Sequence, residues 1–286
     1  MAFRTRSARA GQSRRGRLDP GALAGTAVFS LFLLLAAIGP AVAPYAHQEQ
    51  NIAERLQAPG RAHLFGTDQY GRDVFSRVLA GSRGVFLLGG GATLLAAVLG
   101  TSLGLLAGYY GGLLDEALMR LLDVLLSFPP LLLALLLLAV SGSTTLDLLA
   151  VVTVLYVPVL ARVVRSAVLG LRTQAFVEAA RLRGEKGPYI LFREILPNAL
   201  PPLLVEASMR FAYSIFLVAS LGFLGVGVQP PSPDWGLQIN EARAFLSSAP
   251  WVLAFPAAAI SLLVVATNLM TDGLRRLLLP GAGGRR

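Results

Sequence analysis

The sequence contains no cysteine and only two histidines, and only 14% of its 286 residues are charged. Without cysteine the chain can form neither a disulfide nor a thiolate metal site. His47 and His63 leave little material for a histidine-rich metal site or a Ser-His-Asp triad. A soluble domain carries about 25% charged residues. The low charge and the mean hydropathy of +0.64 therefore indicate that much of the surface faces lipid.

Long hydrophobic runs take up most of the chain, and each is long enough to cross about 30 Å of hydrocarbon as a helix. The first run also resembles a signal peptide, but it exceeds the usual signal length of about 7–15 apolar residues, and Pro44 sits where cleavage would occur. We therefore expect an all-α polytopic membrane protein with six transmembrane helices and a retained first span. The predicted spans cover residues 22–43, 85–109, 118–140, 146–164, 203–226 and 250–270.

Two features inside these spans affect the helices themselves. Pro129-Pro130 is expected to bend the third span. Gly89-Gly90-Gly91 in the second span is no phosphate loop, because no Gly-Lys-Ser/Thr follows it. Glycines in a span favour close helix packing instead.

The net charge of +9 is distributed between the membrane flanks. Six spans place both termini on one side, together with 18 of the 25 Lys and Arg residues, against 6 on the other side. The positive-inside rule then predicts cytoplasmic termini. Residues 1–20 are expected to form a basic tail that rests on anionic lipid. Because the arginines lie at membrane flanks, the charge does not indicate a nucleic-acid partner.

A polar, basic segment at residues 176–202 separates two of the hydrophobic runs and lies on the predicted cytoplasmic side. If its first part is helical, Phe176, Ala179, Ala180 and Arg183 share one face, which would let a partner surface approach closely. Glu178 near the helix start complements the helix dipole, and Gly184 can end the helix in a left-handed conformation. Pro197 would end the segment, and Pro201-Pro202 would open the next helix. On composition alone, a solvated helical hairpin that joins two spans fits equally well.

On the opposite side, residues 47–83 are polar and contain a turn that leads into a short helix. Val74, Phe75, Val78 and Leu79 would form an apolar stripe on this helix, which favours an interfacial helix lying on the membrane. Asp73 and Arg77 are expected to pair at i,i+4. The segment lacks the spacing of a calcium loop. The residues of the turn motif are Gly66, Thr67, Asp68, Gly71, Arg72 and Asp73.

Several motifs resemble one known family. Glu178-Ala179-Ala180, Gly184 and Ile195-Leu196-Pro197 resemble the EAA loop of ATP-binding cassette (ABC) importer permeases. The sequences GTDQYGRDVFSR, VQPPSPDWGLQINEAR and DGLR resemble the dipeptide/oligopeptide branch of that family. The chain departs from the family's usual Leu-Asp-Pro-Arg ending. The resemblance spans most of residues 20–276.

This resemblance implies a type I ABC importer permease fold and a non-enzymatic transport subunit. In such systems the EAA loop docks into a separate ATPase, so its residues would couple ATP hydrolysis to transport. The implied coupling residues are Phe176, Glu178, Ala179, Ala180, Gly184, Ile195, Leu196 and Pro197. The implied partners are a second homologous permease, two ATPases and an extracytoplasmic binding protein. The chain itself would bind no cofactor, because ATP and Mg²⁺ belong to the ATPases. Relatives are associated with peptides, glutathione, nickel or oligosaccharides, so the cargo stays open.

Glu206 and Arg210 lie one helical turn apart in the predicted fifth span. A mid-membrane arginine costs about 2.5–3.5 kcal/mol on insertion scales, so the two residues either pair or line the translocation path. They are also the one feature that a stand-alone secondary transporter could use. The sequence contains no GxxxxGK[ST], HExxH or GxSxG motif, so an enzyme has no visible machinery.

These features divide the chain into five parts. We expect a basic tail at 1–20, an anchor helix at 21–44, an extracytoplasmic loop at 45–83, a permease core at 84–276 that includes the coupling loop 165–202, and a cytoplasmic tail at 277–286.

Overall fold

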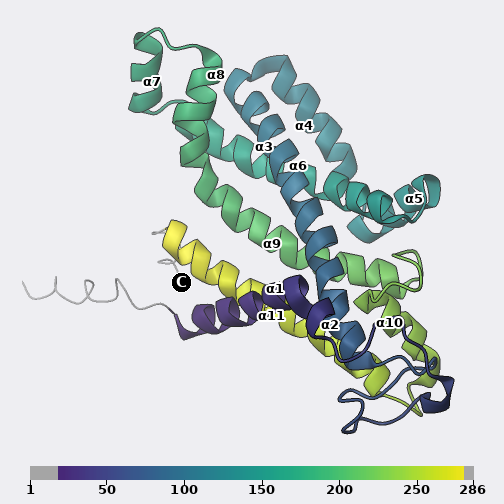
Figure 1. Cartoon of the computed structure of the whole chain (residues 1–286). Coiled ribbons are helices and arrows are strands. Elements are labelled where there is room, and N and C mark those ends of the chain that lie inside the picture. The colour runs from purple at the N-terminus through teal and green to yellow at the C-terminus, as the bar shows by residue number, and fades with distance from the viewer. Residues whose placement is uncertain (1–18, 280–286) are drawn as a thin grey trace, which may run out of the picture.

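A computed structural model describes residues 19–279, and helices dominate this part of the chain (Figure 1). The expected all-α membrane architecture is confirmed, and among the described residues the only β-type pairing is an isolated bridge between Thr67 and Asp73. The predicted tails at 1–20 and 277–286 fall almost wholly outside these residues. The helices are α1 Pro20–Val42, α2 Val74–Val85, α3 Gly91–Tyr110, α4 Gly112–Leu126, α5 Pro130–Ser141, α6 Thr145–Leu171, α7 Ala175–Leu182, α8 Gly187–Tyr189, α9 Leu196–Phe223, α10 Trp235–Ala242 and α11 Trp251–Leu278. Single 3₁₀ turns occur at Ile52–Glu54 and Arg243–Phe245.

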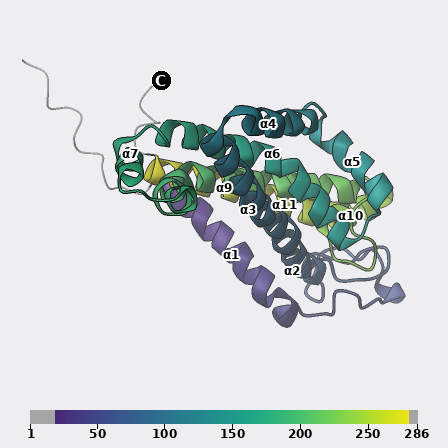
Figure 2. The same cartoon turned by 90° about the horizontal axis from the view of Figure 1, so that it is seen from above.

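The first and last long helices lie side by side and antiparallel (Figures 1 and 2). Gly25 of α1 allows this approach, because a Cβ there would lie 2.8 Å from the carbonyl oxygen of Ala266 in α11. Asp19 caps α1 and also pairs with Arg276 near the end of α11, at 2.5 Å. Both described ends of the chain therefore lie at the same end of the bundle.

The predicted short helix after the turn is present as α2, but the prediction that it lies separately on the membrane surface is wrong. α2 continues through a π-helical turn at Phe86–Gly90 into α3, so that one helix runs from Val74 to Tyr110. Val74 and Val78 are buried in a cluster with Phe32 of α1 and Trp235 of α10, so the apolar stripe packs inside the protein. Within the π-helical turn, a Cβ on Gly89 would lie 2.7 Å from Ser214 Oγ, which confirms close packing at the Gly89-Gly90-Gly91 run.

α3 and α6 run parallel and pack along a row of glycines. A Cβ on Gly104 would lie 2.5 Å from the carbonyl oxygen of Ala161, and one on Gly108 would lie 2.8 Å from Val168 Cβ. Because the two helices point the same way, the chain must return across the bundle between them. α4 and α5 make this return, and they bend by 92° at the break that contains Pro129. The proline bend is confirmed. Within residues 19–279, five helices are long and apolar enough to cross a membrane, and six if the bent pair counts as one crossing.

α9 begins earlier than its prolines suggest. A π-helical turn at Ile190–Ile195 joins α8 to α9, so a nearly continuous helix runs from Gly187 to Phe223. Pro197 lies in the first turn of α9, and Pro201 and Pro202 lie inside it, so the prediction that these two open the helix is wrong. A proline removes one backbone donor and can be accommodated where the neighbouring turn is already irregular.

The directions of the helices define two ends of the bundle. The α7 end holds α7, the start of α1 and the ends of α3, α6 and α11, whereas the α10 end holds α10 and the loop 43–73 (Figure 1).

Candidate functional site

At the α7 end, the short helix α7 buries one side in the protein and exposes the other. Val177 and Ala180 are fully buried in the main apolar cluster, and Phe176 packs against the same cluster. The opposite face carries Ala175, Glu178, Ala179 and Leu182, all exposed. Leu182 is 85% exposed, which is an unusual position for a leucine in a polar segment. α7 therefore exposes a small, partly apolar face, while its opposite face is packed against the main apolar cluster.

The exposed face of α7 is thus shifted by one residue from the face that the sequence predicted. Phe176 and Ala180 hold α7 to its own chain, so the predicted face of Phe176, Ala179, Ala180 and Arg183 is wrong. Val177 decides the register, because a fully buried valine fixes which side of an eight-residue helix points inward. Leu182 was missed, although its position seven residues after Ala175 places both on one helical face.

Polar contacts fix the loop that follows α7. Gly184 has φ +79°, as predicted, and its N–H donates to the carbonyl of Arg181. Arg183 donates to Glu194 at 3.2 Å. The guanidinium of Arg181 lies 5.7 Å from the ring of Tyr109 at the end of α3. These contacts attach α7 to α3 and to the π-helical turn that precedes α9.

The Ile195-Leu196-Pro197 motif lies where the π-helical turn passes into α9. Ile195 is fully buried, Leu196 packs against the main apolar cluster, and Pro197 is exposed. The motif thus anchors the base of the loop and does not share the exposed face of α7.

In the middle of α9, Glu206 and Arg210 form the predicted i,i+4 pair, with Oε1 and Nη2 2.8 Å apart. Their side chains are 13% and 21% exposed. The Arg210 guanidinium also lies 4.7 Å from the ring centroid of Tyr213. Its Nε is buried and has no hydrogen-bond partner among residues 19–279.

At the α10 end, the turn motif forms a tightly packed, hydrogen-bonded loop. Gly66 and Gly71 have φ +75° and +71°. A Cβ on Gly71 would lie 1.8 Å from the carbonyl oxygen of Asn51, so only glycine fits. The Asp68 carboxylate accepts from the backbone N–H groups of Tyr70 and Arg72, and Thr67 donates to the carbonyl of Glu54.

Four charged side chains, three of them buried and that of Glu241 partly exposed, join this turn motif to α10. Arg72 contacts Asp68 at 2.5 Å and Glu241 at 2.6 Å, and Arg77 reaches the same two carboxylates at 3.8 and 3.5 Å. Two positive and two negative charges therefore balance inside the protein; these four residues are called the charge cluster below. The turn motif and the INEAR sequence, separate in the chain, form one unit.

The predicted pair between Asp73 and Arg77 is wrong. Asp73 caps α2 by accepting from the N–H of Ser76, and its other oxygen contacts His63 Nδ1 at 2.9 Å. Arg77 therefore turns to the charge cluster. His47 is half-buried beside it, and burial together with the Arg77 charge lowers the pKa of that imidazole.

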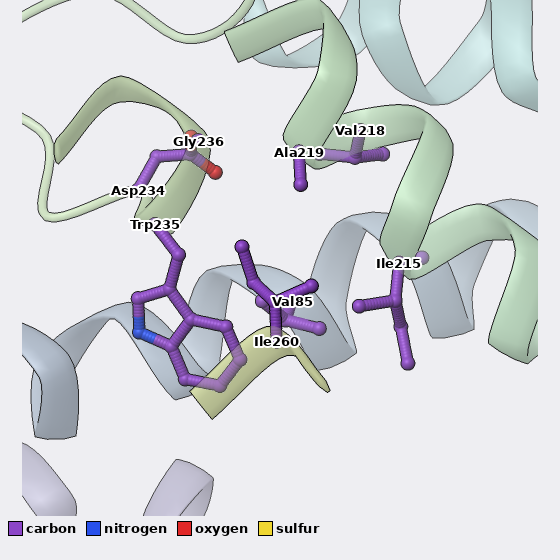
Figure 3. A pocket seen from close by; sticks show the side chains of 9 residues that line it. Val85, Ile215, Val218, Ala219, Asp234, Trp235, Gly236 and Ile260 are labelled. Atoms are coloured by element: carbon purple, nitrogen blue, oxygen red, sulfur yellow. The ribbon is translucent and has the colours of Figure 1, made fainter. Parts of the chain in front are cut away.

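α10 begins at Asp234, whose Oδ1 accepts from the N–H of Leu237. Burial raises the pKa of this carboxyl to about 6. Trp235 is 1% exposed and donates to the carbonyl of Val78. Figure 3 shows Asp234 and Trp235 beside an apolar pocket lined also by Val85, Ile215, Val218 and Ile260. This packing fixes α10 against α2, α9 and α11.

Within the part of the chain that the structure describes, no group of three or more His, Cys, Asp or Glu side chains is arranged to hold a metal ion.

Comparison with known proteins points to one class. Residues 100–283 match the family model described as "Binding-protein-dependent transport system inner membrane component", and residues 13–59 match "N-terminal TM domain of oligopeptide transport permease C". The dipeptide transport system permease protein DppC of Alkalihalophilus pseudofirmus is 40% identical over 91% of this chain and 85% of its own length. The glutathione transport system permease protein GsiD of Pectobacterium atrosepticum is 44% identical over 83% and 79%. The probable D,D-dipeptide transport system permease protein DdpC of Escherichia coli is 37% identical over 94% and 90%.

The helix bundle and these matches together define a multi-pass membrane transport subunit. The chain belongs to the family of binding-protein-dependent transport system inner membrane components. It is the permease of an ABC importer, a non-catalytic subunit that works with an ATPase in a separate chain and with a substrate-binding partner.

Proposed function

We propose that this chain is one of two homologous permease subunits of a peptide importer, and that it forms half of the translocation path. The printed names of its relatives support a peptide cargo, because two name dipeptides and the third names glutathione, itself a tripeptide. Nickel chelates and oligosaccharides are the alternative cargoes. A secondary transporter that works alone is disfavoured by membership of this family.

The exposed face of α7 is the single observation that carries the coupling role. Leu182 and Ala179 offer apolar area, and Glu178 offers a charge, on a helix whose back is locked by Val177 and Ala180. A rigid helix that presents such a face fits the groove of a partner protein. We assign this groove to the ATPase.

The proposed orientation places the α7 end in the cytoplasm. Asp19 and Arg276 pair at this end, so both described chain ends share it with α7. Eighteen of the 25 Lys and Arg residues belong to segments on this side, which fits the positive-inside rule. The α10 end then faces the binding protein.

The proposed assembly follows from one α7 in each permease. Two homologous permeases would offer two such helices and would engage two ATPases. This chain would bind no nucleotide, since it has no GxxxxGK[ST] motif, and ATP and Mg²⁺ would be used in the partners.

Transport would proceed by alternating access. Closure of the ATPases would displace α7, and the contacts of α7 with α3 and α9 would carry that displacement into the membrane helices. The path between the two permeases would then open to one side at a time.

Replacing Leu182 tests the docking role. Burying a leucine contributes about 1.5–3 kcal/mol, so Leu182→Ser should weaken ATPase binding by about one to two orders of magnitude and reduce uptake accordingly. Co-purification of the ATPases and ATP-dependent uptake into proteoliposomes are the two measurements. Leu146→Ser is the matched control, because Leu146 is 76% exposed but lies at the opposite end of the bundle. Equal ATPase binding by both variants would contradict the docking role.

A further inference from the structure

The exposed face of α9 differs from the exposed faces of the helices around it. On α3 the large exposed side chains in mid-helix are aliphatic, as expected against lipid: Leu94, Leu95, Val98, Leu99 and Leu106. On α9 the exposed large side chains in mid-helix include Leu204 and the aromatic Tyr213 and Phe216. The half-buried Glu206 and Ser220 lie on the same face as the two aromatic residues. A carboxylate and a phenol in mid-membrane do not suit a surface that faces lipid.

The Arg210 guanidinium on this face has unused binding capacity. Of its five N–H donors, the structure shows one engaged, with Glu206. Its Nε has no partner among the described residues, and Tyr213 covers one face of its plane. An unmet buried donor is unfavourable, so Arg210 would gain from a second anion. A planar guanidinium binds a carboxylate through two parallel hydrogen bonds.

We propose that Arg210 and Glu206 form a charged subsite on the wall of the translocation path, where the free carboxylate of a passing peptide binds Arg210. The site takes zwitterionic solutes. Glu206 balances Arg210 when the path is empty, and it attracts the solute's ammonium group when the carboxylate takes its place. Tyr213, 57% exposed beside the pair, contacts the solute in transit.

This inference rests on the proposed function, since it needs a peptide to pass. The contact is transient because the solute's carboxylate competes for Arg210 with Glu206, which is part of the protein and stays beside Arg210. A path that releases its cargo requires sites of this kind, strong enough to attract and weak enough to let go.

A photo-crosslinking amino acid, p-benzoylphenylalanine, tests the contact directly. It replaces Tyr213 in one variant of the complete complex and Val98 in the control, because both side chains are 57% exposed and only Val98 lies on the aliphatic face. Complexes in proteoliposomes receive ATP, binding protein and radiolabelled alanyl-alanine. We expect at least tenfold more label at position 213. Equal labelling, or crosslinks from 213 only to the second permease, would overturn the proposal.

The charge requirement is tested in the same background. Unlabelled alanyl-alanine should compete with the label at least tenfold better than its C-terminal amide. The double variant E206Q/R210Q removes both charges together and should abolish the part of this preference that the permease contributes. Size-exclusion chromatography shows whether the variant complex assembles as the parent complex does. An unaltered preference, or a variant complex that no longer assembles, would assign the pair a structural role and refute the proposal. If the parent complex imports no peptide, the proposed function fails first, and the two failures are thus distinct.

Discussion

Neutralising Glu241 should destabilise the α10 end, because the charge cluster is balanced and largely buried. The side chains of Arg72, Arg77 and Asp68 are at most 4% exposed, and that of Glu241 is 15% exposed. In Glu241→Gln, two buried arginines share the single carboxylate of Asp68. A unit charge pair about 4 Å apart contributes about 4 kcal/mol at an effective dielectric constant near 20. Glu241 contacts both arginines, so two such pairs are weakened, and part of their energy is returned because glutamine costs less to desolvate than a carboxylate. We therefore expect a net loss of about 3–5 kcal/mol, as for other broken buried ion pairs.

The two tryptophans of the chain make this loss measurable. Trp235 donates to Val78 in α2, and Trp251 donates to Thr67 in the turn motif, so intrinsic fluorescence reports on the α10 end. The assay is equilibrium unfolding by denaturant of the purified chain in lipid nanodiscs, followed by tryptophan emission.

A double variant and a surface control decide whether charge balance is the cause. Arg77→Met with Glu241→Gln leaves Arg72 paired with Asp68, so the double variant should be more stable than the sum of the two single losses by about 1–3 kcal/mol. Glu116→Gln breaks an exposed i,i+4 pair with Arg120 and should change stability by less than about 1 kcal/mol. Additive single losses, or a Glu241→Gln variant within about 1 kcal/mol of the parent, would refute the reasoning.

Three further predictions use the same readout or a simple biochemical one. Burial raises the pKa of Asp234 to about 6, so this carboxyl binds its proton more tightly in the folded state than in the unfolded state. Its contribution to stability is therefore full below about pH 4 and is lost as the pH rises through 6. Asp234→Asn keeps an acceptor for the N–H of Leu237 and should remove this dependence and add up to roughly 3 kcal/mol at pH 7; an unchanged pH profile would contradict the assignment. Gly71→Ala should cost more than about 2 kcal/mol through its positive φ and the contact with Asn51. Gly60→Ala should cost less than about 1 kcal/mol, because the nearest atom to the added Cβ is the Ala58 carbonyl oxygen at 3.8 Å, and equal effects would refute the strain argument. Gly104→Leu should separate α3 from α6 and prevent recovery of folded chain from the membrane, whereas Gly84→Leu, where no atom lies within 4 Å, should be recovered at the parent level.

The membrane fold could be predicted from the sequence because hydrophobic length sets the crossing helices almost directly. Apolar runs such as residues 22–43 are too long to be left exposed to water, so they form membrane-crossing helices. The consecutive prolines Pro129 and Pro130 interrupt a helix. The prediction failed where a helix continues beyond the oily run. Val74–Val85 has a polar face, and sequence alone cannot show that this face turns toward a charge cluster inside the protein.

The residues of the candidate sites could be predicted from the sequence, but the direction in which their side chains point could be predicted much less well. The EAA-type helix was located, but its outward face depends on which side packs against the cluster around Val177, a contact with residues distant in the chain. The i,i+4 pair of Glu206 and Arg210 is local, and helical spacing was enough to find it.

The charge cluster shows why rules based on sequence spacing cannot assign every ion pair. Arg72 and Glu241 are 169 residues apart in the sequence, whereas a spacing rule assigns a charge to a partner three or four residues away. Asp73 was assigned to Arg77 on that basis, yet Asp73 is needed to cap α2 and to hold His63, which leaves Arg77 free to bind Glu241. A buried charge goes to the partner that also satisfies the burial of its neighbours, and that condition belongs to the folded chain as a whole. The two segments can therefore be recognised separately in the sequence, while the contact that makes them one unit exists only after α2, α9 and α10 have packed.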